Sequence, residues 1–400
     1  MRIGLGLLAK TNVRRVLRRL VRRTMTRIRL VSLWAVLAIL ATAATLTGCP
    51  GEDLAVPRSS YFSQVLILDD GRLACIGAAD YRVRAFNGDQ LNYYVLDSGG
   101  QEISSRKIST SSASYPGLAS LSADGDVLIS GLFVINPGIA ASYGLVMRLA
   151  VDGRTIWKIA ERDGLGSKTL AVNELEDGRV ILVGSGYDGS LIIELDHNGE
   201  IVDTNVGTTL RARVAAIAED GRIFVANNAS PPVLGEFNTD ADLVWQTSVI
   251  EEPDRSMYAE EVFFAANGNI LVLALLGYQD DIFVARIDGE GKLVWTTEIP
   301  VGRSVDSDGH SAIVESSDGT LYVGGTDLLV RLDSDGNELW RKTVPGIIND
   351  LAISADGIVH AVGFRQVEEE GVLVSRMLLM KFDADGNLLS DQIFIGVSEE

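Results

Sequence analysis

The chain has 400 residues, with 35 Lys and Arg against 54 Asp and Glu, three His and two Cys. So few cysteines exclude a disulfide scaffold, and the acidic excess argues against nucleic-acid binding. The charge is uneven, because residues 1–48 carry ten basic and no acidic side chains, which leaves a formal charge of −29 on the other 352 residues. We therefore expect a folded part that repels nucleic acid and anionic headgroups.

The N-terminal segment has the pattern of a secretion signal. Arginines at 22, 23, 27 and 29 precede an uncharged apolar run at residues 30–46, and Cys49 follows Gly48. The run is at the short limit for a membrane span. The segment resembles bacterial lipoprotein signal peptides, which implies cleavage before Cys49, lipidation of its sulfur and acylation of the new amino group. Several acyl chains would hold the protein firmly in a membrane. The alternative is an uncleaved signal anchor.

The predicted domains are a signal peptide over residues 1–48, a lipidated tether over 49–60 and a repeat domain over 61–400. The signal is longer than usual, and Met25 offers an alternative start that gives ordinary proportions. Lipoprotein sorting depends on the residues after the cysteine, which here are Pro50 and Gly51. They leave the choice of membrane open, so we expect a bacterial cell-envelope location on the exported side.

From Tyr61 onward the sequence repeats. An apolar segment, an acidic residue or Asn, a glycine and a second apolar segment recur about every 48 residues, a period typical of propeller repeats. We name this glycine-containing turn the first turn of each repeat. Its seven copies are Asp70-Gly71, Asp124-Gly125, Asp177-Gly178, Asp220-Gly221, Asn267-Gly268, Asp318-Gly319 and Asp356-Gly357.

A second turn lies between the first turns. It contains Asp152-Gly153, Asn198-Gly199, Glu290-Gly291, Asp335-Gly336, Asp385-Gly386, Ser98-Gly99-Gly100 or the glycine-less Asp240-Ala241-Asp242. Tryptophan follows four residues later at Trp157, Trp245, Trp295 and Trp340. Asp-Gly and Asn-Gly favour tight hairpins, so each repeat reads as four antiparallel strands. The sequence therefore predicts an all-β protein, a β-propeller of seven four-stranded blades, with the tryptophans packed between successive blades.

The segments Leu332–Trp340 and Ile287–Trp295 resemble the repeats of quinoprotein-like (PQQ-like) propellers. That family also includes the lipid-anchored propeller subunit of the outer-membrane β-barrel assembly machine, which has eight blades. The resemblance implies architecture more than function. Quinoprotein dehydrogenases need adjacent cysteines over the cofactor, a calcium-holding carboxylate set and an Asp base, and this chain has no adjacent cysteines. We expect no cofactor and no catalytic residues, and we leave a degenerate enzyme open as an alternative.

Other chemical sites are weakly indicated. Cys75 lies in an apolar run and is predicted to be a buried core residue. The stretches 306–309, 333–336 and 383–386 begin like calcium loops, but two of them occupy the regular second turn, so turn chemistry explains them without metal. Three histidines scattered at 197, 310 and 360 show no ligand spacing for zinc.

Repeats one, two and seven have longer segments between their two turns, and these repeats become neighbours when the ring closes. Tight turns should share one face of the propeller and these longer loops the opposite face. Aromatic residues mixed with arginine are typical of protein interfaces. We predict a partner-binding sector made of Tyr81, Arg82, Arg84, Phe86, Phe133, Tyr143, Phe364 and Arg365. The alternative is that the extra residues only lengthen the central strands and bury their aromatic rings.

These observations predict a monomeric, lipid-anchored envelope propeller that acts as a non-catalytic protein-interaction platform. The expected partners are the membrane, through Cys49, and an envelope protein, but no nucleic acid. The alternative is a propeller that binds or senses a small ligand in its central channel. Polar groups that converge on the channel with shifted pKa values would favour the alternative, and a featureless channel would favour the platform.

Overall fold

The computed structural model describes residues 59–397, except 84–85, 109–112, 137–140, 161–164, 187–188, 208–209, 228, 230, 251–255, 266, 277–280 and 302–310. Side chains at 80–89, 111–115 and 133–141 are also outside the description. The predicted signal peptide, Cys49 and most of the tether lie outside it too. Residues 55–400 form one compact unit. In the described residues, no helix has the length and apolar character needed to span a bilayer.

The regular structure of the described residues consists of strands in six antiparallel sheets. Sheets one to three contain β1 Ser60–Ile67, β2 Leu73–Val83, β3 Phe86–Leu96 and β4 Glu102–Ile108; β5 Ala113–Leu121, β6 Val127–Asn136, β7 Ala141–Leu149 and β8 Thr155–Ile159; β9 Lys168–Glu174, β10 Val180–Ser185, β11 Ser190–Leu195 and β12 Ile201–Gly207. Sheets four and five contain β13 Val214–Ile217, β14 Ile223–Ala226, β15 Val233–Phe237 and β16 Leu243–Ser248; β17 Met257–Phe264, β18 Ile270–Leu276, β19 Asp281–Ile287 and β20 Leu293–Ile299. Sheet six contains β21 Ala312–Glu315, β22 Leu321–Leu332, β23 Glu338–Ile353, β24 Val359–Glu369, β25 Val372–Phe382 and β26 Leu388–Phe394.

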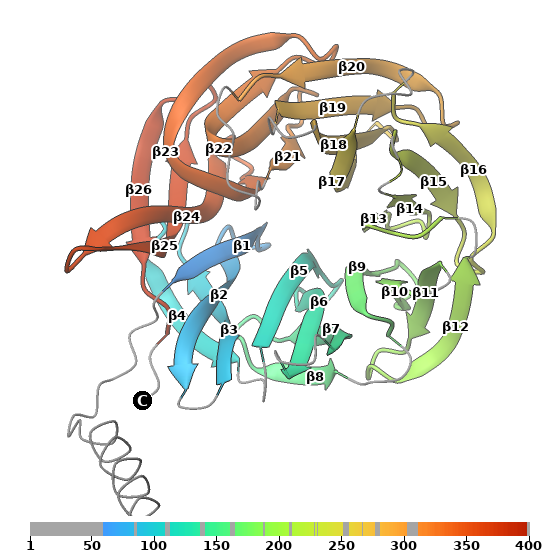
Figure 1. The fold of residues 1–400 in the computed structure, drawn as a ribbon, viewed down its shortest axis with the longest axis horizontal. Helices are drawn as coiled ribbons and strands as arrows, with labels where there is room; N and C mark the ends of the chain where they lie inside the picture. The colour runs from blue at the N-terminus through green and yellow to red at the C-terminus, as the bar shows by residue number, and fades with distance from the viewer. Residues whose placement is uncertain are drawn as a thin grey trace, which may run out of the picture. The chain divides into compact units, whose positions relative to one another are not determined.

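The sheets stand side by side around a common centre, and sheet six closes the ring against sheet one (Figure 1). In each four-stranded sheet the first strand is innermost and the last strand lies at the rim, and in sheet six the second half of β23 also faces the centre. The predicted all-β propeller architecture is therefore present.

The number of blades differs from the sequence prediction. Seven separate four-stranded blades are predicted, whereas the described residues form five sheets of four strands and one sheet of six. The difference arises at β23, whose first half pairs with β22 and whose second half pairs with β24 without a break between them. Repeats six and seven therefore share sheet six, and the count of seven separate blades is corrected to six sheets.

The turns between strands follow the predicted chemistry. In a typical first turn, the Gly71 amide donates to the Leu68 carbonyl at 2.8 Å, and the Leu68 amide donates to the Arg72 carbonyl at 2.8 Å. Gly71 has a φ of 81°, which glycine adopts without steric cost. Ala241, in the one second turn without glycine, adopts a φ of 64° and carries the strain that glycine avoids elsewhere.

The tryptophans pack between successive repeats, as predicted. The indole of Trp295 on β20 lies against Gly336 in the second turn of the next repeat, and its Nε1 donates to the Ser334 carbonyl at 3.0 Å. Trp340 makes the same contact with the Ala384 carbonyl, and Trp157 makes it with the His197 carbonyl. A side chain at Gly336 would strike the indole, so glycine is required there by packing as well as by conformation.

The hydrophobic core is divided among the junctions between repeats. Each of seven apolar clusters in the described residues joins two consecutive repeats, including the pair that shares sheet six and the pair that closes the ring. Cys75 is fully buried in the closing cluster, and burial raises the pKa of its thiol. The prediction that Cys75 is a buried core residue is thus confirmed.

Candidate functional site

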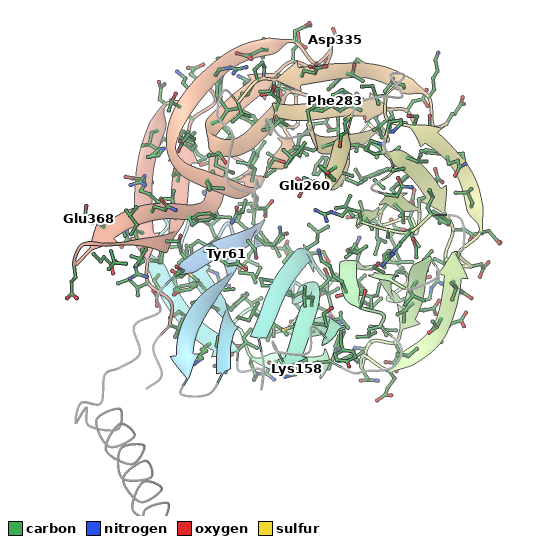
Figure 2. All side chains as sticks on the ribbon, viewed as in Figure 1. Tyr61, Lys158, Glu260, Phe283, Asp335 and Glu368 are labelled. Atoms are coloured by element: carbon green, nitrogen blue, oxygen red, sulfur yellow. The ribbon has the colours of Figure 1, made fainter. Side chains whose placement is uncertain are left out.

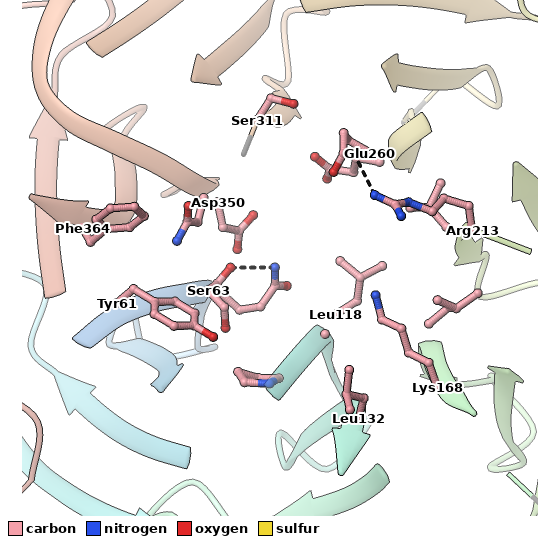
Figure 3. Close-up of a pocket in the computed structure, with 17 residues that line it drawn as sticks. Tyr61, Ser63, Leu118, Leu132, Lys168, Arg213, Glu260, Ser311, Asp350 and Phe364 are labelled. Atoms are coloured by element: carbon pink, nitrogen blue, oxygen red, sulfur yellow. Dashed lines mark hydrogen bonds and ion pairs between the residues drawn. The ribbon is translucent and has the colours of Figure 1, made fainter. Parts of the chain in front are cut away.

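A cavity of about 620 Å³ occupies the centre of the ring (Figure 3). Its walls come mainly from the innermost strands of all six sheets. It is lined by Tyr61, Ser63, Gln64, Pro116, Gly117, Leu118, Leu132, Lys168, Leu170, Arg213, Val214, Glu260, Glu261, Ser311, Asn349, Asp350 and Phe364. This volume is in the range of small-molecule sites.

β-bulges on the inner strands place residues at the cavity. The strand pairing skips Ser63 on β1, Leu170 on β9, Glu260 on β17 and Asn349 on β23, and each skipped residue lines the cavity. A bulge inserts one unpaired residue and redirects the neighbouring side chains. The same local irregularity in several repeats therefore builds the cavity wall.

Three polar side chains that follow these bulges link neighbouring inner strands. The Gln64 side-chain oxygen accepts from the Ala119 amide at 3.2 Å, and one Glu261 oxygen accepts from the Ile313 amide at 3.1 Å. One Asp350 oxygen accepts from the Val65 amide at 2.7 Å, which joins β23 to β1 across the ring closure. These groups thus have a structural role at the cavity wall.

Burial shifts the pKa values of the two linking carboxyl groups. Desolvation raises the pKa of Asp350 to about 7, and the Val65 amide opposes the shift only in part. Desolvation also raises the pKa of Glu261 well above its usual value, and the nearby charge of Asp350 adds to the effect. Since the low-polarity surroundings disfavour charge, this side of the cavity is partly protonated near neutral pH.

Another part of the cavity wall carries cations. Arg213, just before β13, forms an ion pair of 3.1 Å with Glu260 on β17, and Lys168 at the start of β9 lies nearby (Figure 3). Lys168 is open to the cavity but surrounded by protein, so desolvation and the charge of Arg213 lower its pKa, while Glu260 opposes this. A second cavity of about 500 Å³ shares Lys168, Leu170 and Arg213 with the first and adds Arg211.

Two polar atoms in the wall have no hydrogen-bond partner among the described residues: Ser311 Oγ and Asn349 Oδ1. Ser311 is only 8% exposed, and the Asn349 amide is oriented because its Nδ2 donates to the Phe62 carbonyl at 2.6 Å. Unpaired buried polar groups are costly and call for an explanation. The cavity can therefore offer hydrogen bonds and charges of both signs to a ligand.

Three of the predicted partner-binding residues, Tyr143, Phe364 and Arg365, have described side chains, and these three lie in different surroundings. Phe364 lines the central cavity with its ring 6.5 Å from that of Tyr61, and Arg365 pairs with Asp391 at 2.7 Å. Tyr143 packs against the core between sheets one and two. The strands of these repeats are long, as the alternative interpretation expected, with 11 residues in β2, β3, β24 and β25. The described part of the chain excludes Arg84 and the side chains of Tyr81, Arg82, Phe86 and Phe133.

The calcium-like stretches that are described serve as turns. Asp333 Oδ1 accepts from the amides of Asp335 and Asn337 at 2.9 and 2.8 Å, and Asp383 does the same in its turn. The stretch at 306–309 and His310 lie outside the described residues. Within the described ranges, no group of three or more His, Cys, Asp or Glu could hold a metal ion.

The sequence analysis missed Lys168, Arg213, Glu260, Glu261 and Asp350. A signal for most of them was present, because the residue eight positions before each first-turn glycine lines the cavity in all seven repeats, and the residue seven positions before it does so in five. In the seven repeats these pairs are Ser63-Gln64, Gly117-Leu118, Leu170-Ala171, Arg213-Val214, Glu260-Glu261, Ser311-Ala312 and Asn349-Asp350. Aligning the repeats on that glycine would have exposed charged pairs such as Glu260-Glu261 inside otherwise apolar strands.

Comparisons with known proteins agree with this architecture. The family described as "Outer membrane protein assembly factor BamB" matches residues 279–388, which run from β19 through β25. Together with the observed fold, the match supports a PQQ-like β-propeller domain. The match covers about a quarter of the chain, and no curated protein matches it.

Solved structures resemble the propeller in fold alone. A catalytically inactive virginiamycin B lyase from Staphylococcus aureus, in complex with quinupristin, has a TM-score of 0.56 and 11% identity over 76% of this chain and 92% of that one. The Pan2 WD40 domain of Neurospora crassa has a TM-score of 0.54 and 13% identity over 76% and 86% of the two chains. At such identities, function cannot be transferred from fold.

Proposed function

We propose that this protein is a lipid-anchored cell-envelope propeller that serves as a non-catalytic docking platform for another envelope protein. The family resemblance supports a protein-binding propeller, and the lipobox-like sequence before Cys49 supports the anchor. The observation that carries the proposal is the hairpin formed by β24 and β25. It belongs to the sector that the sequence analysis singled out.

This hairpin projects beyond the neighbouring sheets and carries Glu368 near its end (Figure 2). Val372 and Leu373 at its tip are 61% and 66% exposed, the highest values among the exposed large apolar side chains of the described residues. The Arg376 guanidinium, which is almost fully buried, binds the carboxylate of Glu369, the residue that pairs with Val372 across the hairpin. An ordered, projecting apolar pair is typical of an interface anchor rather than a solvated loop.

The test is photo-crosslinking in the native envelope with the reactive group at Leu373. Val294 on β20 is the matched control, because it is apolar and 51% exposed but lies on a different sheet. We expect one specific protein adduct from position 373 and none from 294. Equal labelling from both positions, or none from 373, would contradict the platform. A Cys49→Ala variant that stays membrane-bound would contradict the anchor.

A second candidate function is the binding of a small ligand in the central cavity. Polar groups with shifted pKa values converge there, and Ser311 and Asn349 each have an unpaired buried oxygen within the described residues. Such groups favour a ligand site over a structural channel. The two functions are compatible, because the hairpin tip and the cavity are different surfaces of the propeller.

A further inference from the structure

We infer that the junction of the two cavities binds a small molecule through an oxyanion, a phosphate or carboxylate group, which is held by Lys168, Arg211 and Arg213. This inference rests on the second candidate function and names its ligand class. Lys168 and Arg213 line both cavities, and Arg211 lines the smaller one. The three cations come from two neighbouring sheets and meet at one place.

The charge balance at this junction is positive. Glu260 is the only carboxylate among the described lining residues of the two cavities that pairs with any of these cations, and it pairs with Arg213 at 3.1 Å. The side chains of Lys168 and Arg211 form no hydrogen bond or ion pair with other described residues, and Arg211 is exposed. Two cations therefore remain available for a ligand, and arginine suits planar or tetrahedral oxyanions because of its fork of donors.

The surroundings supply neutral polar groups of fixed orientation. The smaller cavity is also lined by Ser167, Ser185 and Asn227. The Asn227 side-chain oxygen accepts from the amides of Ala229 and Val233 at 3.0 and 2.9 Å, so the orientation of its amide group is fixed. The Ser167 hydroxyl donates to the Ser185 carbonyl at 3.1 Å. An ordered rim of this kind lowers the entropic cost of binding.

The acidic character of the rest of the domain is compatible with the inference. The chain after residue 48 has a formal charge of −29. Charges beyond about 8 Å are largely screened at physiological salt. The local cations therefore determine which ligand binds, and the distant carboxylates do not. The apolar residues Leu118, Leu132 and Leu170 in the larger cavity can contact the organic part of the ligand.

The test is isothermal titration calorimetry on the full chain in detergent, with inorganic phosphate, pyrophosphate and citrate as probes. Phosphate and pyrophosphate test for recognition of a phosphate group, and citrate tests for recognition of a carboxylate group. Glycerol serves as the uncharged probe. The variants are Lys168→Met and Arg211→Met, because neither substitution removes an ion pair between described residues. Arg222→Met is the matched control. Arg222 is a cation that directly precedes β14 in sheet four and pairs with Asp220 in a first turn.

We expect at least one oxyanion to bind, with affinity reduced about tenfold or more in each of the two variants and unchanged in Arg222→Met. Thermal unfolding of each variant checks that the fold is retained. An equal loss in Arg222→Met would indicate unspecific attraction and overturn the inference. Binding of glycerol but of no oxyanion would leave the cavity as a ligand site and overturn the assigned class. An absence of binding for every probe would count against both the inference and the second candidate function.

Discussion

Asp350 shows how a single residue connects the fold to the cavity. Its carboxylate lines the central cavity, yet one oxygen is occupied by the Val65 amide of the neighbouring sheet. A buried carboxylate without a cation beside it holds its proton more tightly than in water, and its pKa is accordingly raised to about 7. The contribution of Asp350 to the free energy of unfolding therefore depends on pH.

Replacing Asp350 by Asn should remove this dependence. Because the folded state holds the proton up to about pH 7 and the unfolded state releases it near 4, Asp350 lowers the free energy of unfolding as pH rises between these values. The upper limit is about 1.4 kcal/mol for each pH unit in that window. Urea unfolding at pH 5 and 7.5 should show wild type losing stability relative to Asp350→Asn.

The control is Asp333→Asn in a second turn. The pKa of Asp333 is lowered by the side chain and amide of Asn337, so its contribution has the opposite sign. Wild type should gain stability relative to this variant as pH rises through the acidic range. Parallel pH profiles for wild type and Asp350→Asn would contradict the assigned ionisation.

At the scale of elements, the same contact recurs between repeats. The outermost strand of one repeat packs against the second turn of the next repeat. Trp340 on β23 donates through Nε1 to the Ala384 carbonyl at 3.2 Å and covers Gly386. Arg331 reaches the same carbonyl at 3.0 Å. Where tryptophan is missing, other donors replace it: Asn205 reaches the Thr239 carbonyl at 3.2 Å, and Tyr93 reaches the Val151 carbonyl at 3.0 Å.

Trp340→Phe should lower the free energy of unfolding by about 1–2 kcal/mol, because it removes a hydrogen bond and part of the packed ring. Leu339→Ala on the same strand is the control, since Leu339 is 51% exposed and should change stability by less than about 0.5 kcal/mol. Chemical unfolding of both variants provides the measurement. Equal effects would show that the tryptophan contact contributes nothing beyond strand propensity.

At the scale of the whole molecule, the ring closes through side chains. Lys381 on β25 donates to the Ser98 carbonyl, which is the position that Trp340 and Arg331 reach in the preceding repeat. Tyr94 donates to the Ile395 carbonyl at 2.7 Å, and Asn349 donates to the Phe62 carbonyl. No strand pairing joins sheet six to sheet one among the described residues. The closure therefore depends on packing and individual hydrogen bonds.

Lys381→Met should weaken this closure by about 1.5–3 kcal/mol, which is the range for hydrogen bonds to charged groups. Arg331→Met removes the equivalent contact inside sheet six, where the strand pairing of β23 persists. Hydrogen exchange should therefore become faster in sheet one for Lys381→Met and stay nearly unchanged there for Arg331→Met. Unchanged exchange in both variants would mean that the apolar cluster alone holds the ring closed.

The sequence by itself determined the architecture and its repeating contacts. Turn glycines, apolar strands and tryptophans at fixed spacing predict the hairpins and the inter-repeat packing, because these depend on local backbone preference and on a pattern repeated along the chain. The burial of Cys75 followed from the same pattern. The sequence contains seven copies of the repeat and so predicted seven separate blades, because it could not show that β23 would join the last two repeats in one sheet.

The tertiary structure alone decided the cavity and its chemistry. Lys168, Arg213, Glu260 and Asp350 are far apart in the chain, and only ring closure and the bulges on the inner strands bring them to one place. It also placed Phe364 at the cavity instead of in an outward loop. Local patterns determine which residues form strands, whereas the pKa values, charge balance and accessible groups of a site depend on distances that no local pattern contains.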